Sequence, residues 1–167
     1  MTHYLLLVIS LPDRAVQIAG ITTQPDEAWM LQVARNLVDE EAGVLQGKRY
    51  LIIDRDTKYS DQFRRLIRDN GTKVIRLPPM SPNLNAYAER FVRSIKFECL
   101  NRMIFIGEAS LRRAVAEYIA HYHGERNHQG LNSHLIRRTR TVAANDGVVH
   151  RRARLGGMLN FYYREAA

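Results

Sequence analysis

The chain has 167 residues and a net charge of +8, from 25 Lys and Arg against 17 Asp and Glu. Its apolar fraction of 46% is enough for a hydrophobic core, which excludes a disordered chain, and its length fits one domain. The one cysteine excludes an internal disulfide and a cysteine-based zinc cage. The longest apolar run, 4–9, is too short to span a bilayer, and the first residues lack the pattern of a secretory leader. We therefore expect a cytoplasmic protein without membrane partners.

The positive charge is typical of proteins that bind an anion, most commonly nucleic acid, but also of basic surfaces that have no partner. Composition alone leaves both interpretations open. The basic residues cluster from the middle of the chain onward, at Arg64, Arg65, Arg68, Arg93, Lys96, Arg112, Arg113, Arg137, Arg138, Arg140, Arg151, Arg152 and Arg154.

The first half of the chain predicts strands that alternate with helices. Residues 3–10 form a continuous apolar run typical of a buried strand, and 15–22 alternate as a second strand that pairs back through a turn. The elements that follow are an amphipathic helix over 25–41 with Asp26 as N-cap, a strand over 49–54, a helix over 60–71 between Ser60 and Gly71, and a strand over 73–77. This order predicts an α/β fold.

The second half predicts helices and a basic tail. A long helix starts at about residue 84, and its apolar face contains Ala88, Phe91, Ile95 and Cys99. A further helix covers 110–123 with Ser110 as cap. We expect 1–123 to form the core and 124–167 to dock on it or extend it.

The long helix carries polar residues beside its apolar face. At roughly 100° per residue, Asn85, Glu89 and Lys96 fall within about 40° of one another. A carboxylate at this position indicates either a salt bridge at the rim of the core or a functional site.

Asp54 is the second acidic candidate, because it ends a predicted strand, where sites in α/β sheets gather. Together with Glu89 it could bind Mg²⁺, which prefers carboxylate, water and phosphate oxygens. Lys96 lies two helical turns after Glu89 and could bind a phosphate. The alternative is structural: Asp54 caps the strand end, and Glu89 pairs with Arg93.

Three motifs add a resemblance to a known family. The segments "DRDTKYS" (54–60), "LPPMSPNLNAYAERFVRSIKFE" (77–98) and "YHGERNHQGL" (122–131) resemble the catalytic core of DDE-type transposases and retroviral-type integrases, including bacterial insertion-sequence transposases. All three occur in the family's order and spacing. The resemblance implies a ribonuclease H-like fold, a mixed sheet with flanking helices.

The resemblance also implies site residues and chemistry. It makes Asp54 the second and Glu89 the third catalytic acid, both of them ligands of Mg²⁺ or Mn²⁺. It places Asn85, Lys96, Arg93 and Lys58 at DNA contacts that set register and read little sequence. The implied reaction is metal-assisted cleavage at the element's DNA end, followed by transfer of the strand into target DNA. Family members act as multimers, so we expect a homo-oligomer.

One departure from the family matters. Residues 3–10 and 15–22 match its second and third strands, so the first strand, which carries the first catalytic Asp, should precede Met1. We expect a chain that lacks this strand, an incomplete two-metal site and little or no catalysis. The strands over 3–10 and 49–54 should then pair directly or leave backbone groups unpaired. Alternatives are a non-catalytic DNA-binding remnant and a ribonuclease H-like nuclease that cuts without joining.

Three other features have a structural interpretation. His121 and His123 are two positions apart on a helix and point to different sides, which argues against a shared zinc ion. Tyr87 is interpreted as a packing residue and Asp13 as a turn former.

Overall fold

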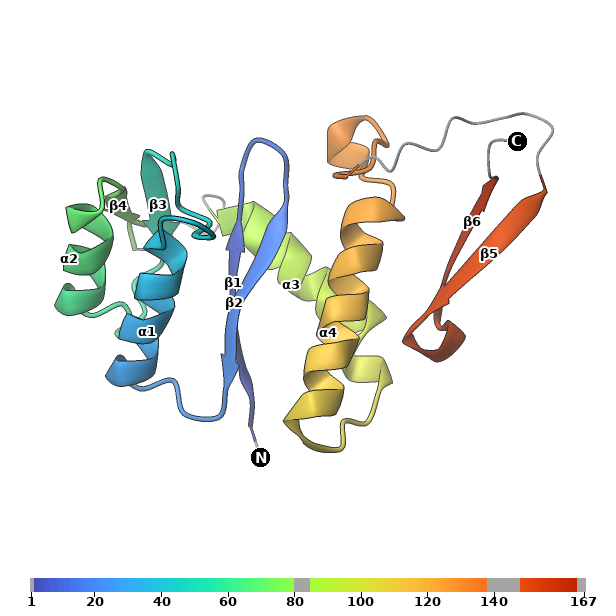
Figure 1. Ribbon diagram of the computed structural model, residues 1–167, viewed down its shortest axis with the longest axis horizontal. Coiled ribbons are helices and arrows are strands. Elements are labelled where there is room, and N and C mark those ends of the chain that lie inside the picture. The colour runs from blue at the N-terminus through green and yellow to red at the C-terminus, as the bar shows by residue number, and fades with distance from the viewer. Residues whose placement is uncertain (1, 80–84, 138–147, 165–167) are drawn as a thin grey trace. The chain divides into compact units, whose positions relative to one another are not determined.

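The computed structural model describes residues 2–79, 85–137 and 148–164 (Figure 1). The chain divides into two compact units. The first unit combines Met1–Val8 with Gln17–Ala86, and the second combines Ile9–Val16 with Tyr87–Ala167. Within the described part of the chain, no helix combines the length and apolar character that crossing a membrane requires.

The predicted alternation of strands and helices is confirmed, and the fold class is α/β. In chain order the elements are β1 (Tyr4–Ile9), β2 (Val16–Thr22), α1 (Glu27–Val38), β3 (Tyr50–Ile53), α2 (Asp61–Asp69), β4 (Lys73–Arg76), α3 (Ala86–Glu98), the 3₁₀ turn η2 (Leu100–Arg102), α4 (Gly107–Gly124), η3 (Gln129–Leu131), β5 (Val149–Arg154), η4 (Leu155–Gly157) and β6 (Leu159–Arg164).

The predicted N-caps of the first two helices are confirmed. The Asp26 carboxylate accepts a hydrogen bond from Trp29 N (2.8 Å), and the Ser60 hydroxyl accepts one from Phe63 N (3.3 Å). Gly71 follows α2 with a φ of 85°, a conformation that favours glycine. Helix α1 ends at Val38, three residues before the predicted end. The Asp39 carboxylate accepts the next backbone N–H groups and closes a turn there.

The prediction for α4 was wrong at its start. The helix begins at Gly107, and Ile106 occupies the N-cap position. Ser110 lies inside the first turn, where its hydroxyl donates to the carbonyl of Gly107 (2.9 Å). A serine in the first turn can make this local bond as readily as a cap bond, so the serine alone does not mark the helix start.

The strands form three separate two-stranded sheets within the described ranges. β1 pairs with β2, β5 pairs with β6 in antiparallel register, and β3 lies parallel to β4. The single mixed sheet that the sequence predicted is therefore not formed here. Without a strand between them, β1 and β3 were expected either to pair directly or to leave backbone groups unpaired. They do not pair with each other, so the second expectation is met. Among the described residues, each keeps one edge without a ladder partner.

The core of the first unit lies between two helices and the β3 strand. Apolar side chains of α1, β3 and α2 pack together, and Leu6 and Val8 of β1 contact the same cluster. The buried members are Met30, Val33, Ala34, Leu37, Leu45, Leu51, Ile53, Phe63 and Ile67.

The core of the second unit lies between α3 and α4. Phe91 packs edge-on against Tyr122, with ring centroids 5.0 Å apart, and also contacts Tyr118 at 6.1 Å. Ile95 and Cys99 are buried on the same face, as predicted. Burial raises the pKa of the Cys99 thiol to about 11, so this cysteine behaves as an apolar core residue.

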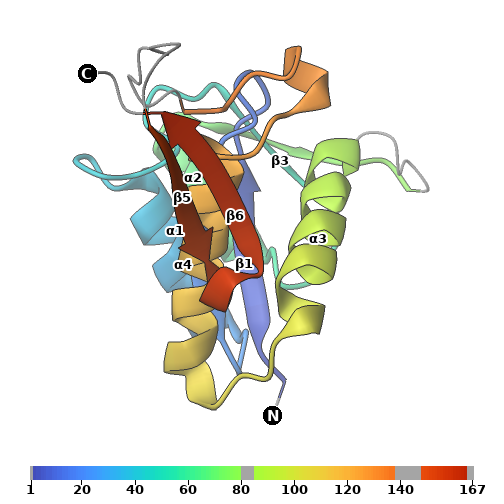
Figure 2. The same ribbon diagram turned by 90° about the vertical axis from the view of Figure 1, so that its right-hand side faces the viewer.

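The C-terminal hairpin of β5 and β6 lies beside α4 (Figures 1 and 2). Leu155, in the η4 turn, is buried, and its backbone N–H donates to the Glu117 carboxylate of α4 (2.6 Å). The sequence analysis expected this tail to dock but did not predict its two strands.

Two phenylalanines of α3 provide a matched test of this packing. Phe91 is 0% exposed and Phe97 is 75% exposed. We expect Phe91→Ala to lower the free energy of unfolding by about 3–5 kcal/mol, because it leaves a cavity among aromatic rings. Phe97→Ala should change it by less than about 0.5 kcal/mol. Urea unfolding followed by circular dichroism measures both, and equal effects would contradict the α3–α4 core.

Candidate metal and nucleic-acid site

Asp54 lies where the parallel pair β3–β4 ends. Leu77 N donates to Ile53 O (2.9 Å), which extends the ladder one step beyond the strands. The guanidinium of Arg55 donates to Leu77 O (2.9 Å) and fixes the loop that follows β3. The Asp54 side chain is exposed, and its Oδ1 accepts the backbone N–H of Asp56 (3.0 Å). Within the described ranges, Asp54 makes no other hydrogen bond or ion pair.

Lys58, a predicted DNA contact, is bonded within its own loop. Its Nζ lies 2.9 Å from Oδ2 of Asp56, and its backbone N–H donates to Oδ1 of the same residue. The backbone N–H of Lys58, followed by the ammonium, lowers the pKa of Asp56, and the same side-chain bond raises the pKa of Lys58. Because Asp56 compensates part of its charge, Lys58 would attract a phosphate less strongly than an unpaired lysine.

The exposed face of α3 carries Glu89, Arg93 and Lys96, while Phe91 and Ile95 are buried on the other side. The Glu89 carboxylate makes no hydrogen bond or ion pair with any residue in the described ranges. The alternative in which Glu89 pairs with Arg93 is therefore not found. Asn85 is half-buried and comes directly before the helix.

The other glutamate of α3 has a different environment. Glu98 pairs with Arg126 (2.9 Å) and accepts a hydrogen bond from the Tyr118 hydroxyl (3.1 Å). Burial, followed by the charge of Glu98, raises the pKa of Tyr118 far above its usual value. Glu98 therefore holds α3 and α4 together, whereas Glu89 has no such partner in the described ranges.

The histidines at the end of α4 have separate structural partners. His121 Nδ1 lies 3.1 Å from a Glu125 oxygen, and His123 Nε2 accepts the backbone N–H of Val16 (3.0 Å). His128 Nε2 lies 2.7 Å from the carbonyl of Tyr122. In the described part of the chain, no three His, Cys, Asp or Glu side chains gather in an arrangement that could hold a metal ion.

Glu125 is a buried residue that the sequence analysis missed. The Arg154 guanidinium bonds both of its oxygens at 2.6–2.9 Å, and Arg152 approaches to 3.4 Å. Burial would raise the pKa of the Glu125 carboxyl, but bonds from Arg154, His121 and Arg152 outweigh it and lower this pKa. The spacing of His121 and Glu125, one helical turn apart, was the only signal in the sequence. The arginine partners come from 27 and 29 positions away.

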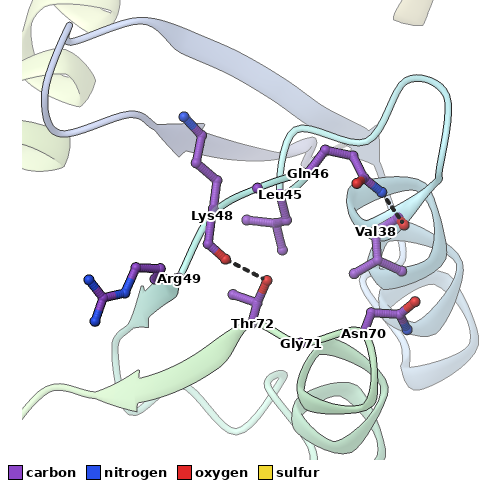
Figure 3. A pocket seen from close by; sticks show the side chains of 9 residues that line it. Val38, Leu45, Gln46, Lys48, Arg49, Asn70, Gly71 and Thr72 are labelled. Atoms are coloured by element: carbon purple, nitrogen blue, oxygen red, sulfur yellow. Dashed lines mark hydrogen bonds between the residues drawn. The ribbon is translucent and has the colours of Figure 1, made fainter.

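A shallow pocket of about 270 Å³ lies in the first unit, away from the predicted site residues (Figure 3). Its polar side chains are already bonded: Thr72 donates to Lys48 O (3.0 Å) and Asn70 to Leu66 O (2.9 Å). The charged ends of Lys48 and Arg49 extend away from Thr72. The pocket therefore offers little to an anion and contains no acidic residue for a metal.

Comparison with family models supports the resemblance. Residues 70–134 match the family described as "Integrase core domain". This match supports an integrase or transposase catalytic core, as the motifs predicted. It includes Asn85, Glu89, Arg93 and Lys96, while Asp54 and Lys58 precede it. A search of curated proteins finds no match.

The His123–Val16 hydrogen bond predicts that stability depends on pH. Burial, followed by the positive charges of Arg137 and His128, lowers the pKa of His123 below its ordinary value of 6.5. Below pH 6.5 the unfolded chain binds the proton more readily, because a protonated imidazole cannot accept the Val16 bond. The stability present above pH 6.5 should therefore fall as the pH drops through this value toward the lower folded-state pKa.

Urea unfolding on either side of pH 6.5 measures this effect. His123→Gln keeps an acceptor but does not titrate, so it should flatten the pH dependence, while His128 leaves a residual slope of the same sign. His134→Gln, at an exposed histidine, is the control. An unchanged slope in His123→Gln would contradict this assignment.

Proposed function

We propose that this chain is the catalytic core of a DDE-type transposase or integrase with a ribonuclease H-like fold, which cuts and joins DNA with a divalent metal ion. One observation carries the proposal. Within the segment that matches the integrase core, Glu89 is exposed, has no partner in the described ranges, and shares its helix face with two cations, Arg93 and Lys96.

Asp54 and Glu89 suit Mg²⁺ or Mn²⁺ as ligands. Both are exposed carboxylates, which are the hard oxygen donors that these ions prefer. Asp54 uses one oxygen for the backbone of Asp56, which orients the other. The two residues belong to different units, so their convergence is part of the proposal. When bound, the metal supplies Lewis-acid stabilisation of the phosphodiester displacement.

The basic residues of α3 position the DNA. Lys96 and Arg93 would bind phosphates of the substrate strand, and Asn85 would hydrogen-bond the backbone nearby. These contacts fix register without reading the base sequence. We further propose that the protein acts on paired DNA ends as a homo-oligomer, with 1–123 as the core and 124–167 as its extension.

Two carboxylates are too few for a complete two-ion site. We therefore propose that this chain alone has weak or no strand-transfer activity. A strand inserted between the unpaired edges of β1 and β3 would join the two small sheets of the first unit and could carry a third acid. Such a strand would produce the mixed sheet that the family resemblance implies.

A second candidate function is DNA binding without catalysis. It is favoured by the net charge of +8 and by the exposed cations Arg93 and Lys96 on α3. This function predicts steep salt dependence of DNA binding with no effect of Mg²⁺. A nuclease that cuts without joining would instead show nicked but no joined product.

Metal binding can be tested without catalysis. Mn²⁺ should raise the thermal midpoint of the wild-type chain, because a ligand of the folded state stabilises it. Asp54→Asn and Glu89→Gln should each abolish most of this rise. Glu27→Gln, at an exposed glutamate in the first turn of α1, should keep it. An equal rise in all four proteins would place the metal elsewhere.

Strand transfer tests the catalytic role. This chain would be compared with any longer in-frame product that the encoding DNA specifies upstream of Met1, using labelled DNA and Mg²⁺. We expect joined product from a longer protein that adds an aspartate-bearing strand, and its loss in Glu89→Gln. Joined product that survives Glu89→Gln would overturn the role of Glu89. No joining by any product would favour the DNA-binding function.

Lys96 provides a separate test of DNA contact. Lys96→Gln should reduce the slope of log affinity against log salt by about 1, since one phosphate contact is lost. Lys48→Gln, at an exposed lysine of the first unit, should leave the slope unchanged. Fluorescence anisotropy with duplex DNA over a salt series measures both. An equal reduction of the slope in both variants would mean that the net charge, and not the position of Lys96, determines the DNA affinity.

A further inference from the structure

The β5–β6 hairpin has two chemically different faces. In its register, Arg152 and Arg154 project to one side with Phe161 opposite Arg152. This side contacts α4, because both arginines reach the Glu125 carboxylate. Strand alternation places Arg151, Tyr162 and Arg164 on the other side, which we call the outer face.

The opposite face, which we call the inner face, is packed, and its positive charge is partly compensated by one carboxylate. Glu125 takes up the guanidinium of Arg154 with a two-point bond and also approaches Arg152. Tyr163 stacks on Phe161 with centroids 5.8 Å apart and on His150 at 5.7 Å. These rings and charges therefore hold the hairpin together and attach it to α4.

On the outer face, Arg151 keeps its positive charge. It donates to the side-chain oxygen of Asn160 (2.8 Å), a neutral partner, and no carboxylate within the described ranges compensates its guanidinium. No Asp or Glu occurs anywhere in 149–164. An anionic ligand on this face would therefore meet the positive charge of Arg151.

Tyr162 lies within this charged surface and is 62% exposed. Its direct cross-strand neighbour is Arg151, and Arg164 follows two residues later on the same face. Neighbouring side chains on one face of a strand pair lie about 5–8 Å apart, close to the spacing of a base and its own phosphate. The exposed Tyr162 ring therefore offers a stacking surface, and the guanidinium beside it offers hydrogen-bond donors to a phosphate.

This combination favours an unpaired strand over a duplex. Bases within a duplex stack on one another and present only their edges, so the face of the Tyr162 ring would gain nothing from them. An unpaired base can stack on an aromatic side chain while arginines bind the flanking phosphates.

We propose that the outer face of the β5–β6 hairpin binds an unpaired nucleic-acid strand, with a base stacked on Tyr162 and the neighbouring phosphate bound by Arg151. This site goes beyond the proposed catalytic function. It uses neither Asp54 nor Glu89 and holds even if the chain transfers no strands.

Binding of labelled oligothymidylate and of a labelled duplex to the full chain tests the proposal by fluorescence anisotropy. Tyr162→Thr removes the ring but keeps a residue that favours strands. It should weaken oligothymidylate binding by about 5- to 100-fold, the range for loss of one stacked base, and leave duplex binding within about 2-fold. Tyr162→Phe keeps the ring and should bind like the wild type.

The matched control is Tyr50→Thr. Tyr50 is 48% exposed on β3, has an arginine nearby as Tyr162 does, and lies outside the hairpin. Tyr50→Thr should leave the affinities for oligothymidylate and for the duplex unchanged. The proposal is overturned if Tyr162→Thr binds oligothymidylate with unchanged affinity. It is also overturned if this variant loses as much affinity for the duplex as for oligothymidylate, or if Tyr50→Thr loses as much affinity as Tyr162→Thr.

Arg151→Gln tests the phosphate contact independently. The variant keeps a donor for Asn160, so the hairpin should persist, and the far-ultraviolet circular dichroism and thermal midpoint check this. The salt slope of oligothymidylate binding should fall by about 1. An unchanged slope with an intact hairpin would remove Arg151 from the site.

Discussion

The buried carboxylate of Glu125 is the interaction on which the C-terminal half depends. A buried charge is costly unless it is paired and hydrogen-bonded, and Glu125 meets this requirement with His121, Arg152 and Arg154. Removing Arg154 would leave the carboxylate with only the weaker bond from Arg152 and the contact with His121. The need to satisfy one acid at the end of α4 therefore fixes the position of the hairpin, and hence which of its arginines face solvent.

The first unit is governed by a different constraint, the hydrogen bonding of strand edges. β1 and β3 contribute to one apolar core yet belong to separate two-stranded sheets. Small sheets are weak by themselves, so burial of apolar side chains from α1, β3 and α2 supplies most of the cohesion here. The same constraint explains why catalytic competence and completion of the sheet are linked in the proposed function. One inserted strand would satisfy backbone edges and could supply a ligand.

Local patterns in the sequence predicted local structure well. Asp26, Ser60 and Gly71 act where their side-chain chemistry or backbone freedom indicated, and Phe91, Ile95 and Cys99 form the buried face of α3. The prediction of an integrase or transposase core is confirmed over 70–134. The roles of Asp54, Glu89, Asn85, Lys96, Arg93 and Lys58 stay predictions.

Interactions that join distant segments could not be predicted. The Glu125–Arg154 pair spans 29 positions and the His123–Val16 bond spans 107, distances over which no periodic pattern operates. The β5–β6 hairpin was missed because its arginines hide the alternation of polar and apolar residues. These arginines also have different partners, Asn160 for Arg151 and Glu125 for Arg154, although they are close together in the sequence.

What distinguishes the charged residues of this chain is the presence or absence of a partner rather than their type. Glu98 and Glu125 have arginine partners and hold the second unit together, whereas Glu89 has none in the described ranges. Arg154 pairs with an acid, whereas Arg151 pairs with a neutral amide. A charge that the fold does not neutralise carries a cost in self-repulsion and contributes nothing to packing. Under the two proposals made above, a ligand would neutralise the charges of Glu89 and Arg151, one through a cation and the other through a phosphate.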